Sequence, residues 1–323
     1  MSKPVSIKTP ERFQWLIPPE FAGTVRADSL LKRCLPTLSQ RSRKELFLNK
    51  GVRINGRPVS KGFKASPGDK LEIECPGPLD PFQNPAQEAR PLIAYEDQAL
   101  LIVVKPGLIH THPLNHFERG TMVQTLAAYW PRILKVGNKP LEPGLVHRLD
   151  HGTSGLLAVA LTPQAWVRLK KDLAAGKWRK TYRALVSGVI SETLTLSRPL
   201  AHDPQDERKM KVLQGSGDPR RGRAYKAITT IRPLTRYPKA TLVDIDLITG
   251  VMHQIRVHLS AQGHPLIGDA LYGSPYGQEL GLPPGRFFLH ASELSLPHPI
   301  TRKPITLFAE IPEDLQKVLN AFV

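Results

Sequence analysis

A single carboxylate stands among basic and turn-forming residues near the middle of the chain. Asp150 follows His147 and Arg148 and precedes the turn-forming run 151–155, after which an apolar stretch begins at Leu156. Because turns leave an Asp side chain exposed, this position suits a reactive site better than a core. An ionised carboxylate there can attack an electrophilic carbon or remove a proton. An isolated Asp before Gly-Thr-Ser is more often a turn or cap residue, so the chemistry needs further support.

That support comes from the order of several motifs along the chain. They resemble the motifs of the RluA family of RNA pseudouridine synthases, over roughly residues 90 to 313. Four ordered motifs are a much stronger signal than any one of them. The stretches that carry the resemblance are 144–155, 180–188, 253–259 with 263–269, and 289–291.

The resemblance implies an activity and a set of site residues. The family isomerises uridine in RNA to pseudouridine without a cofactor. Its catalytic residues correspond to Asp150, Tyr182 and Arg256, with Arg256 holding the carboxylate and Tyr182 lying against the uracil. Arg148 would fill the gap left by an extruded nucleotide, and with His147 it would contact the RNA. Extrusion is required because the reacting bond is inaccessible inside a base stack.

Each assignment has an ordinary alternative. Tyr182 alone would be a core residue of a strand, and Arg256 alone a surface ion pair of little energetic value. Whether Asp150 acts as a nucleophile or as a base stays open. His253 and His258 lie five residues apart and so point about 140° apart on a helix, which argues against a metal site.

Two positions depart from the family's pattern. Val251 and Met252 follow Gly250 where Gly-Arg-Thr or Gly-Arg-Ser is usual. His151 and Gly152 follow Asp150 where Lys or Arg followed by Asp is common. These changes bear on substrate choice and rate, whereas the three catalytic residues are retained.

The composition favours a polyanionic partner. The 45 Lys and Arg against 28 Asp and Glu give a net charge of +17, which points first to nucleic acid and second to an acidic membrane surface. No apolar stretch has the length of a membrane span, and the start lacks a secretory signal. Cys34 and Cys75 cannot build a disulfide framework or a four-cysteine zinc site. We therefore expect a soluble, cytoplasmic, monomeric protein without a metal or a membrane partner.

The segment 24–75 differs in composition from the rest of the chain. It predicts a helix over 25–36, a second helix beginning at Ser39, a hairpin over 52–59 that turns at Asn-Gly, and a strand over 70–74. This order, with a basic second helix, resembles the αL RNA-binding domain of a small-subunit ribosomal protein. Phosphate contacts of this kind position RNA without reading its sequence. The predicted contacts come from Arg41, Arg43, Lys44, Lys50, Arg53 and Lys61.

The remaining chain predicts one larger domain. Residues 1–23 form an N-terminal extension, 76–91 a proline-rich linker, and 92–323 the catalytic domain. Strands and helices intermix there without a regular βαβ order, so we expect an α+β fold with a mixed, mainly antiparallel sheet flanked by helices. The expected strands include 99–104, 156–161, 181–186 and 241–248, and the expected helices 121–130, 162–176 and 312–322.

These observations predict an RNA pseudouridine synthase. The attached RNA-binding domain favours large-subunit ribosomal RNA as substrate, with transfer RNA as the alternative. A non-catalytic RNA-binding protein is a rival of a different class. A nucleoside or glycoside hydrolase is a third possibility. Such an enzyme usually needs a second catalytic carboxylate, for which Asp269 is the nearest candidate. We expect Asp269 to be structural instead.

Overall fold

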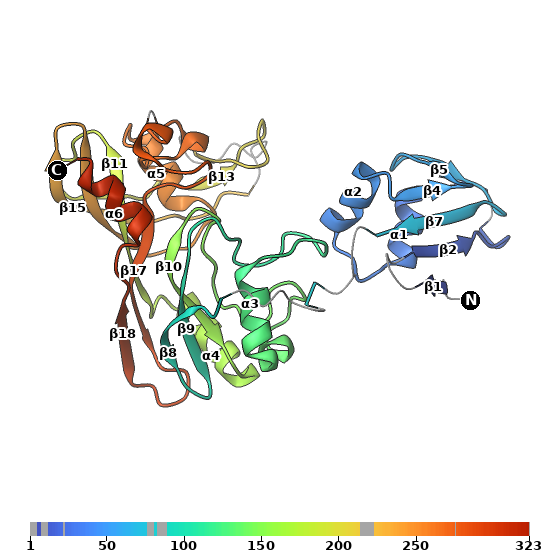
Figure 1. Cartoon of the computed structure of the whole chain (residues 1–323), viewed down its shortest axis with the longest axis horizontal. Coiled ribbons are helices and arrows are strands. Elements are labelled where there is room, and N and C mark those ends of the chain that lie inside the picture. Colours follow the sequence, from blue (N-terminus) through green and yellow to red (C-terminus); the bar gives the residue numbers. More distant parts are fainter. Residues whose placement is uncertain are drawn as a thin grey trace. The chain divides into compact units, whose positions relative to one another are not determined.

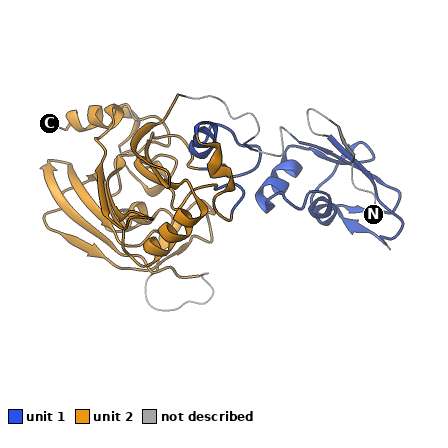
Figure 2. Ribbon diagram, turned by 90° about the horizontal axis from the view of Figure 1, so that it is seen from below, with its two compact units in different colours: residues 1–88, 112–129, 139–142 blue, residues 89–111, 130–138, 143–323 orange. Residues whose placement is uncertain are grey.

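The chain forms two compact units. The computed structural model describes residues 5–7, 12–21, 23–75, 81–82, 89–213, 223–274 and 276–322. Unit 1 contains residues 1–88, 112–129 and 139–142, and unit 2 contains residues 89–111, 130–138 and 143–323 (Figure 2). Most of the predicted linker, 76–91, lies outside the described residues.

Unit 1 is built on a five-stranded antiparallel sheet with the strand order β1-β2-β7-β4-β5 (Figure 1). A second, two-stranded ladder joins β3 and β6. The strands are β1 (Val5–Ile7), β2 (Arg12–Leu16), β3 (Val25–Arg26), β4 (Val52–Ile54), β5 (Arg57–Pro58), β6 (Lys64–Ala65) and β7 (Lys70–Glu74). The helices are α1 (Ala27–Cys34), α2 (Gln40–Leu48) and α3 (Met122–Tyr129).

Local signals account for the elements of this unit. The Ser39 hydroxyl accepts a hydrogen bond from the Ser42 N–H and so begins α2, as expected of an N-cap. Asn55 and Gly56 adopt φ angles of 50° and 79°, which confirms the predicted tight turn of the β4–β5 hairpin. Residues 12–16, predicted to belong to an N-terminal extension, pair with β7 and are part of the same sheet.

Unit 2 contains a nine-stranded mixed sheet with the order β12-β15-β16-β11-β17-β10-β9-β8, and β18 also pairs with β17. Only β10 and β17 run parallel among the pairs in the described part of the sheet. The strands are β8 (Leu92–Glu96), β9 (Leu100–Lys105), β10 (Ser154–Ala160), β11 (Arg179–Ser187), β12 (Leu194–Leu196), β15 (Thr229–Tyr237), β16 (Ala240–Leu247), β17 (Leu289–Pro297) and β18 (Pro304–Phe308). The predicted α+β class with a mainly antiparallel sheet is confirmed.

The described part of unit 2 also contains three α-helices and a separate hairpin. They are α4 (Pro163–Ala174), α5 (Gln254–Ala261), α6 (Glu313–Asn320) and the antiparallel pair β13 (Leu200–His202) and β14 (Met210–Val212). Short 3-10 helices are η1 (Pro131–Lys135), η3 (Ala270–Tyr272) and η4 (Gln278–Leu280). Thr162 caps α4 through the Ala165 N–H, as predicted from the Thr-Pro pair.

The core of unit 2 runs along the central strands. All seven residues of β10 are buried, which is why this segment reads as a continuous apolar run. Leu169 of α4 packs against β10, and Leu315 of α6 packs with Leu185 of β11. Across the residues that the structure covers, no helix has the length and apolar character needed to cross a membrane.

Candidate active site

The backbone on either side of Asp150 is held by hydrogen bonds. The Thr111 hydroxyl donates to the Leu149 carbonyl at 2.7 Å, and the Leu149 N–H lies 3.2 Å from the same hydroxyl oxygen. The Asp150 carbonyl accepts from the Thr153 N–H at 3.1 Å. The Asp150 side chain nevertheless keeps 30% of its surface exposed. The loop therefore offers a fixed carboxylate to solvent.

Three of the sequence motifs meet at one residue of β17. Ala291 pairs with Gly155 of β10 on one side and with Tyr182 of β11 on the other. A Cβ atom at position 155 would lie 2.3 Å from the Ala291 carbonyl oxygen, and Gly155 has a φ of 114°, so only glycine fits. This close approach places β10, which follows the Asp150 loop, next to β17, and β17 in turn pairs with β11, which carries Tyr182.

Arg256 connects two carboxylates. Its Nη1 lies 3.4 Å from Oδ2 of Asp150, while Nε and Nη2 donate to both oxygens of Asp269 at 2.7 and 2.9 Å. The guanidinium also lies over the rings of Tyr272 and Phe287, at 4.9 and 4.4 Å from their centroids. These contacts fix the plane of the guanidinium, so that its remaining nitrogen faces Asp150.

Tyr182 completes the predicted group. The residue is buried, and burial together with the negative charge of Asp150 raises the pKa of its phenol. The phenol therefore stays protonated at neutral pH and can donate a hydrogen bond or pass a proton. The structure thus brings Asp150, Tyr182 and Arg256 into one neighbourhood of unit 2.

The predicted RNA-contacting residues of this unit differ in their surroundings. Arg148 is exposed next to Asp150. His147 instead accepts a hydrogen bond from the Ala158 N–H at its Nε2, and its ring lies edge-on to Trp178. Burial, with nearby Lys180, lowers the pKa of His147 to about 3, so the ring is neutral. His147 has a structural role here, and its contact with RNA stays a prediction.

The six cations predicted to contact phosphate all belong to unit 1. Arg43 is half-buried and donates to the Leu38 carbonyl. The other five are exposed, namely Arg41, Lys44, Lys50, Arg53 and Lys61. Their side chains are therefore accessible to a polyanion.

Sequence reasoning missed several residues that shape the site. Phe287 and Tyr272 flank the guanidinium of Arg256, and nothing in their local pattern indicates this. Asp269, the nearest candidate for a second catalytic carboxylate, is 1% exposed, and both its oxygens bind Arg256. The sequence shows the motif that contains Asp269, but it does not show that Arg256 is the partner of Asp269. The predicted structural role of Asp269 agrees with these contacts.

Lys105 is a further residue that the sequence did not single out. Its ammonium is fully buried and donates to the carbonyls of Pro106 and Ile109 at 2.8 Å, with the His151 carbonyl at 3.4 Å. Burial lowers the pKa of Lys105 to about 7, with a further contribution from nearby Arg286. The Lys105 amine thus links the 106–109 segment to the backbone of His151, the residue after Asp150.

Gly152, one of the departures from the family pattern, lies in a crowded place. A Cβ atom there would lie 2.2 Å from the Gly285 carbonyl oxygen and 2.6 Å from the Phe287 ring. The Gly152 carbonyl accepts from Nη1 of the buried Arg286 at 2.5 Å. Glycine therefore lets the Asp150 loop approach the ring on which Arg256 stacks.

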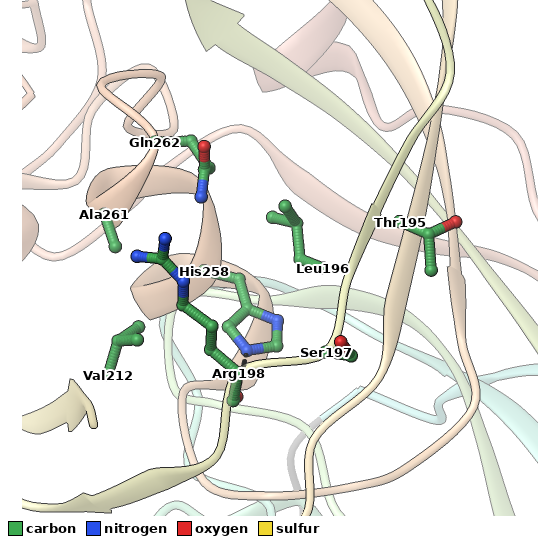
Figure 3. Close-up of a pocket in the computed structure, with 8 residues that line it drawn as sticks. All are labelled: Thr195, Leu196, Ser197, Arg198, Val212, His258, Ala261 and Gln262. Carbon is green, nitrogen blue, oxygen red and sulfur yellow. Dashed lines mark hydrogen bonds between the residues drawn. The ribbon is translucent and has the colours of Figure 1, made fainter. Parts of the chain in front are cut away.

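A cavity of about 250 Å³ lies elsewhere in unit 2 (Figure 3). It is lined by Thr195, Leu196, Ser197, Arg198, Val212, His258, Ala261 and Gln262. None of Asp150, Tyr182 and Arg256 is among these residues, so the cavity is separate from the candidate active site.

Comparison with known proteins defines the class to which this fold and site belong. Residues 99–261, about half of the chain, match the family described as RNA pseudouridylate synthase. The chain belongs to this family and is an RNA pseudouridine synthase, an isomerase. The family resemblance of the ordered motifs is thereby confirmed.

Individual relatives extend the match over most of the chain. A Synechocystis protein described as an uncharacterized RNA pseudouridine synthase is 36% identical over 91% of this chain and 88% of its own length. The ribosomal large subunit pseudouridine synthase D of Neisseria meningitidis is 32% identical over 97% of this chain and 82% of its own. The structure of human RNA pseudouridylate synthase domain containing 1 has 27% identity and a TM-score of 0.55, covering 69% of this chain and 84% of that one.

Proposed function

We propose that this enzyme isomerises uridines of large-subunit ribosomal RNA and that Asp150 is its catalytic carboxylate. The observation that carries the site assignment is the partly exposed Asp150 carboxylate, 3.4 Å from the guanidinium of Arg256. The ribosomal substrate is supported by the 32% identity, over 97% of this chain, with the Neisseria meningitidis enzyme named for the large ribosomal subunit.

The reaction requires an ionised acid beside the sugar. The bond between the anomeric carbon and the uracil nitrogen must break, the base must turn, and a carbon–carbon bond must replace it. Asp150 can attack the sugar or remove a proton from it, and both roles need the charged form that Arg256 stabilises. Tyr182, protonated and next to Asp150, lies against the extruded base and helps to move the proton from its carbon 5.

Binding of RNA is divided between the units in this proposal. Arg148, exposed beside Asp150, fills the space of the extruded nucleotide. The small sheet and helices of unit 1 act as an αL-type domain whose exposed cations neutralise phosphates. The enzyme acts as a monomer, and a ribosomal substrate would place it in the cytoplasm.

The experiment compares wild type and Asp150→Asn on ribosomal and transfer RNA, with pseudouridine mapped on each. Asn keeps the shape of Asp but cannot carry the charge. We expect the variant to form no detectable pseudouridine while its RNA affinity stays within about 3-fold of wild type, since phosphate contacts dominate affinity. Glu192→Gln, at an exposed position without a proposed role, is the control.

Each outcome is informative. An active Asp150→Asn variant would reject the assignment of the catalytic carboxylate. Product on transfer RNA but not on ribosomal RNA would replace the proposed substrate by its alternative. Release of free uracil would favour the hydrolase hypothesis.

A further inference from the structure

We propose that His253 is a positioning residue for Asp150, presenting an N–H to its carboxylate, and that Tyr272 and the β13–β14 hairpin set the orientation of that N–H. The inference rests on the proposed catalytic role of Asp150. It gives a function to a histidine outside the Asp150–Tyr182–Arg256 group.

His253 lies between Asp150 and Tyr272. It immediately precedes α5 and adopts a left-handed backbone conformation with φ of 54°. Its Nε2 lies 3.9 Å from Oδ2 of Asp150, and its Nδ1 lies 2.9 Å from the Tyr272 hydroxyl. The His253 and Tyr272 rings meet edge to face, with an interplanar angle of 87°. With this left-handed backbone conformation, the His253 side chain lies between Asp150 and Tyr272.

The donors and acceptors in this chain of contacts can be assigned. The Met210 N–H can only donate, so the Tyr272 oxygen accepts from it at 2.9 Å. The Tyr272 hydrogen is then available to Nδ1 of His253, and a neutral imidazole that accepts at Nδ1 carries its proton on Nε2. Burial lowers the pKa of His253, although the charge of Asp150 opposes this, so the ring is neutral at neutral pH. The proton on Nε2 therefore faces Asp150.

Two donor groups lie near the same oxygen of Asp150. Arg256 and His253 both lie nearest to Oδ2, at 3.4 and 3.9 Å. The longer distance exceeds a hydrogen bond, but contacts of this kind often tighten only when substrate is bound. Because both donors lie on the side of Oδ2, the other oxygen, Oδ1, is left to act on the ribose. His253 would thus orient the carboxylate as well as stabilise its charge.

The β13–β14 hairpin is held at two points, one to η3 and one to α5. Met210, which begins β14, bonds Tyr272, and the Arg198 carbonyl, just before β13, accepts from Nε2 of His258 at 2.9 Å (Figure 3). Val251 and Met252, the two departures before His253, pack into one apolar cluster with Leu200, Met210, Ala227 and Val257. In the family pattern these two positions hold a basic and a hydroxyl residue. Here the two apolar side chains pack against the hairpin instead. Because they immediately precede His253, the position of the hairpin is linked to that of His253.

A pair of substitutions at position 253 separates the two contacts of the histidine. Asn tolerates the left-handed backbone and offers an oxygen near the Nδ1 position, but it does not extend to Asp150. Gln can place an N–H where Nε2 lies. We expect His253→Asn to lower kcat by about 10- to 100-fold, the range typical of outer-shell partners, with KM within about 3-fold. His253→Gln should recover most of kcat.

The kinetic outcome can count against the proposal in two ways. Unchanged kcat in His253→Asn would overturn it, and so would an equal loss in both variants, because a merely structural histidine does not distinguish them. If Asp150→Asn is inactive while His253→Asn is fully active, only the role of His253 fails. If Asp150→Asn is active, the proposed function of Asp150 fails first.

Nitrogen-15 NMR of the ring tests the hydrogen-bond chain without turnover. The wild-type spectrum should show His253 protonated at Nε2, and Tyr272→Phe should give a mixture of tautomers. Tyr225→Phe is the matched control, because Tyr225 packs in the same apolar cluster but its ring lies against His202. A proton on Nδ1 in the wild type, or an unchanged spectrum in Tyr272→Phe, would overturn the assignment.

Discussion

At the scale of residues, the site depends on how one guanidinium is shared. Both oxygens of Asp269 bind Arg256 and the residue is buried, whereas Asp150 lies 3.4 Å from one nitrogen of the same guanidinium and stays partly exposed. A buried, bidentate pair is costly to break and holds the cation in one orientation. In the proposed mechanism Asp150, the less tightly held partner of Arg256, is the carboxylate that acts on the substrate. The proposal thus gives two aspartates different roles because their surroundings differ.

Gly152 permits a residue-scale prediction. We expect Gly152→Ala to lower the free energy of unfolding by about 1 to 3 kcal/mol, the usual cost of overpacking, because its Cβ would meet the Gly285 carbonyl oxygen at 2.2 Å. The shift of the loop should also reduce kcat. Urea unfolding and single-turnover kinetics measure the two effects.

The control for this prediction is Gly277→Ala. A Cβ atom there has its nearest neighbour at 3.7 Å, the Gly268 Cα, so it fits without strain. Equal stability of the Gly152 and Gly277 variants would show that the loop can move away at no cost.

At the scale of elements, the site is assembled on the central strands and on the start of α5. Strand β17 fixes the register of β10 and β11, since Ala291 pairs with Gly155 and Tyr182. A register slip of one residue would turn Tyr182 to the opposite face of the sheet. The helix α2 of unit 1 plays a different part, because its role in the proposal is electrostatic and does not depend on register.

Helix α2 allows a prediction about RNA binding. Arg41 and Lys44 are three residues apart, so they lie on one exposed face. Replacing both by Gln should reduce the slope of log Kd against log salt by roughly 0.7 to 0.9 for each lost phosphate contact. Filter binding to ribosomal RNA over a salt series measures this slope.

Lys171→Gln with Lys303→Gln is the matched control, since both lysines are exposed and neither carries a predicted RNA contact. The control should lower affinity only weakly and leave the slope nearly unchanged. The same slope change in both double variants would argue that general charge, and not α2, is responsible.

At the scale of the whole molecule, buried neutral histidines link stability to pH. His290 is fully buried, with Ser154 at its Nδ1 and the Ala309 carbonyl at its Nε2, and burial lowers its pKa to about 4. His258 is also buried with a lowered pKa, again mainly through burial. Each of these rings binds a proton more readily in the unfolded chain than in the folded one.

The sign of the pH effect follows directly. Between the unfolded pKa near 6.5 and the folded value of about 4, the unfolded state holds the extra proton, so stability falls as pH decreases through this window. Above pH 6.5 His290 contributes no pH dependence. At pH values below about 4, the lowered pKa of His290 reduces the free energy of unfolding by up to about 3 kcal/mol. We expect urea midpoints to decrease between pH 6.5 and 4, and to decrease less steeply in His290→Gln. Parallel curves for the two proteins would contradict this role of His290.

Much of this protein was predictable from local sequence. The cap at Ser39, the Asn-Gly turn, the strand over 70–74 and the buried run of β10 all depend on neighbours within a few residues, and the structure confirms them. The ordered motifs likewise identified the family, because a resemblance in sequence needs no coordinates.

The tertiary structure alone decided which side chains meet. Asp150 and Arg256 are 106 residues apart, and His147 turned out to bond β10 although its neighbour Arg148 is exposed. Nothing local indicated that Tyr272 would link the hairpin to His253. Helix periodicity and turn preference act over short spans of chain, whereas the choice of partner depends on strand register and packing between distant segments. That is why the sequence determined the kind of site, and only the fold determined its arrangement.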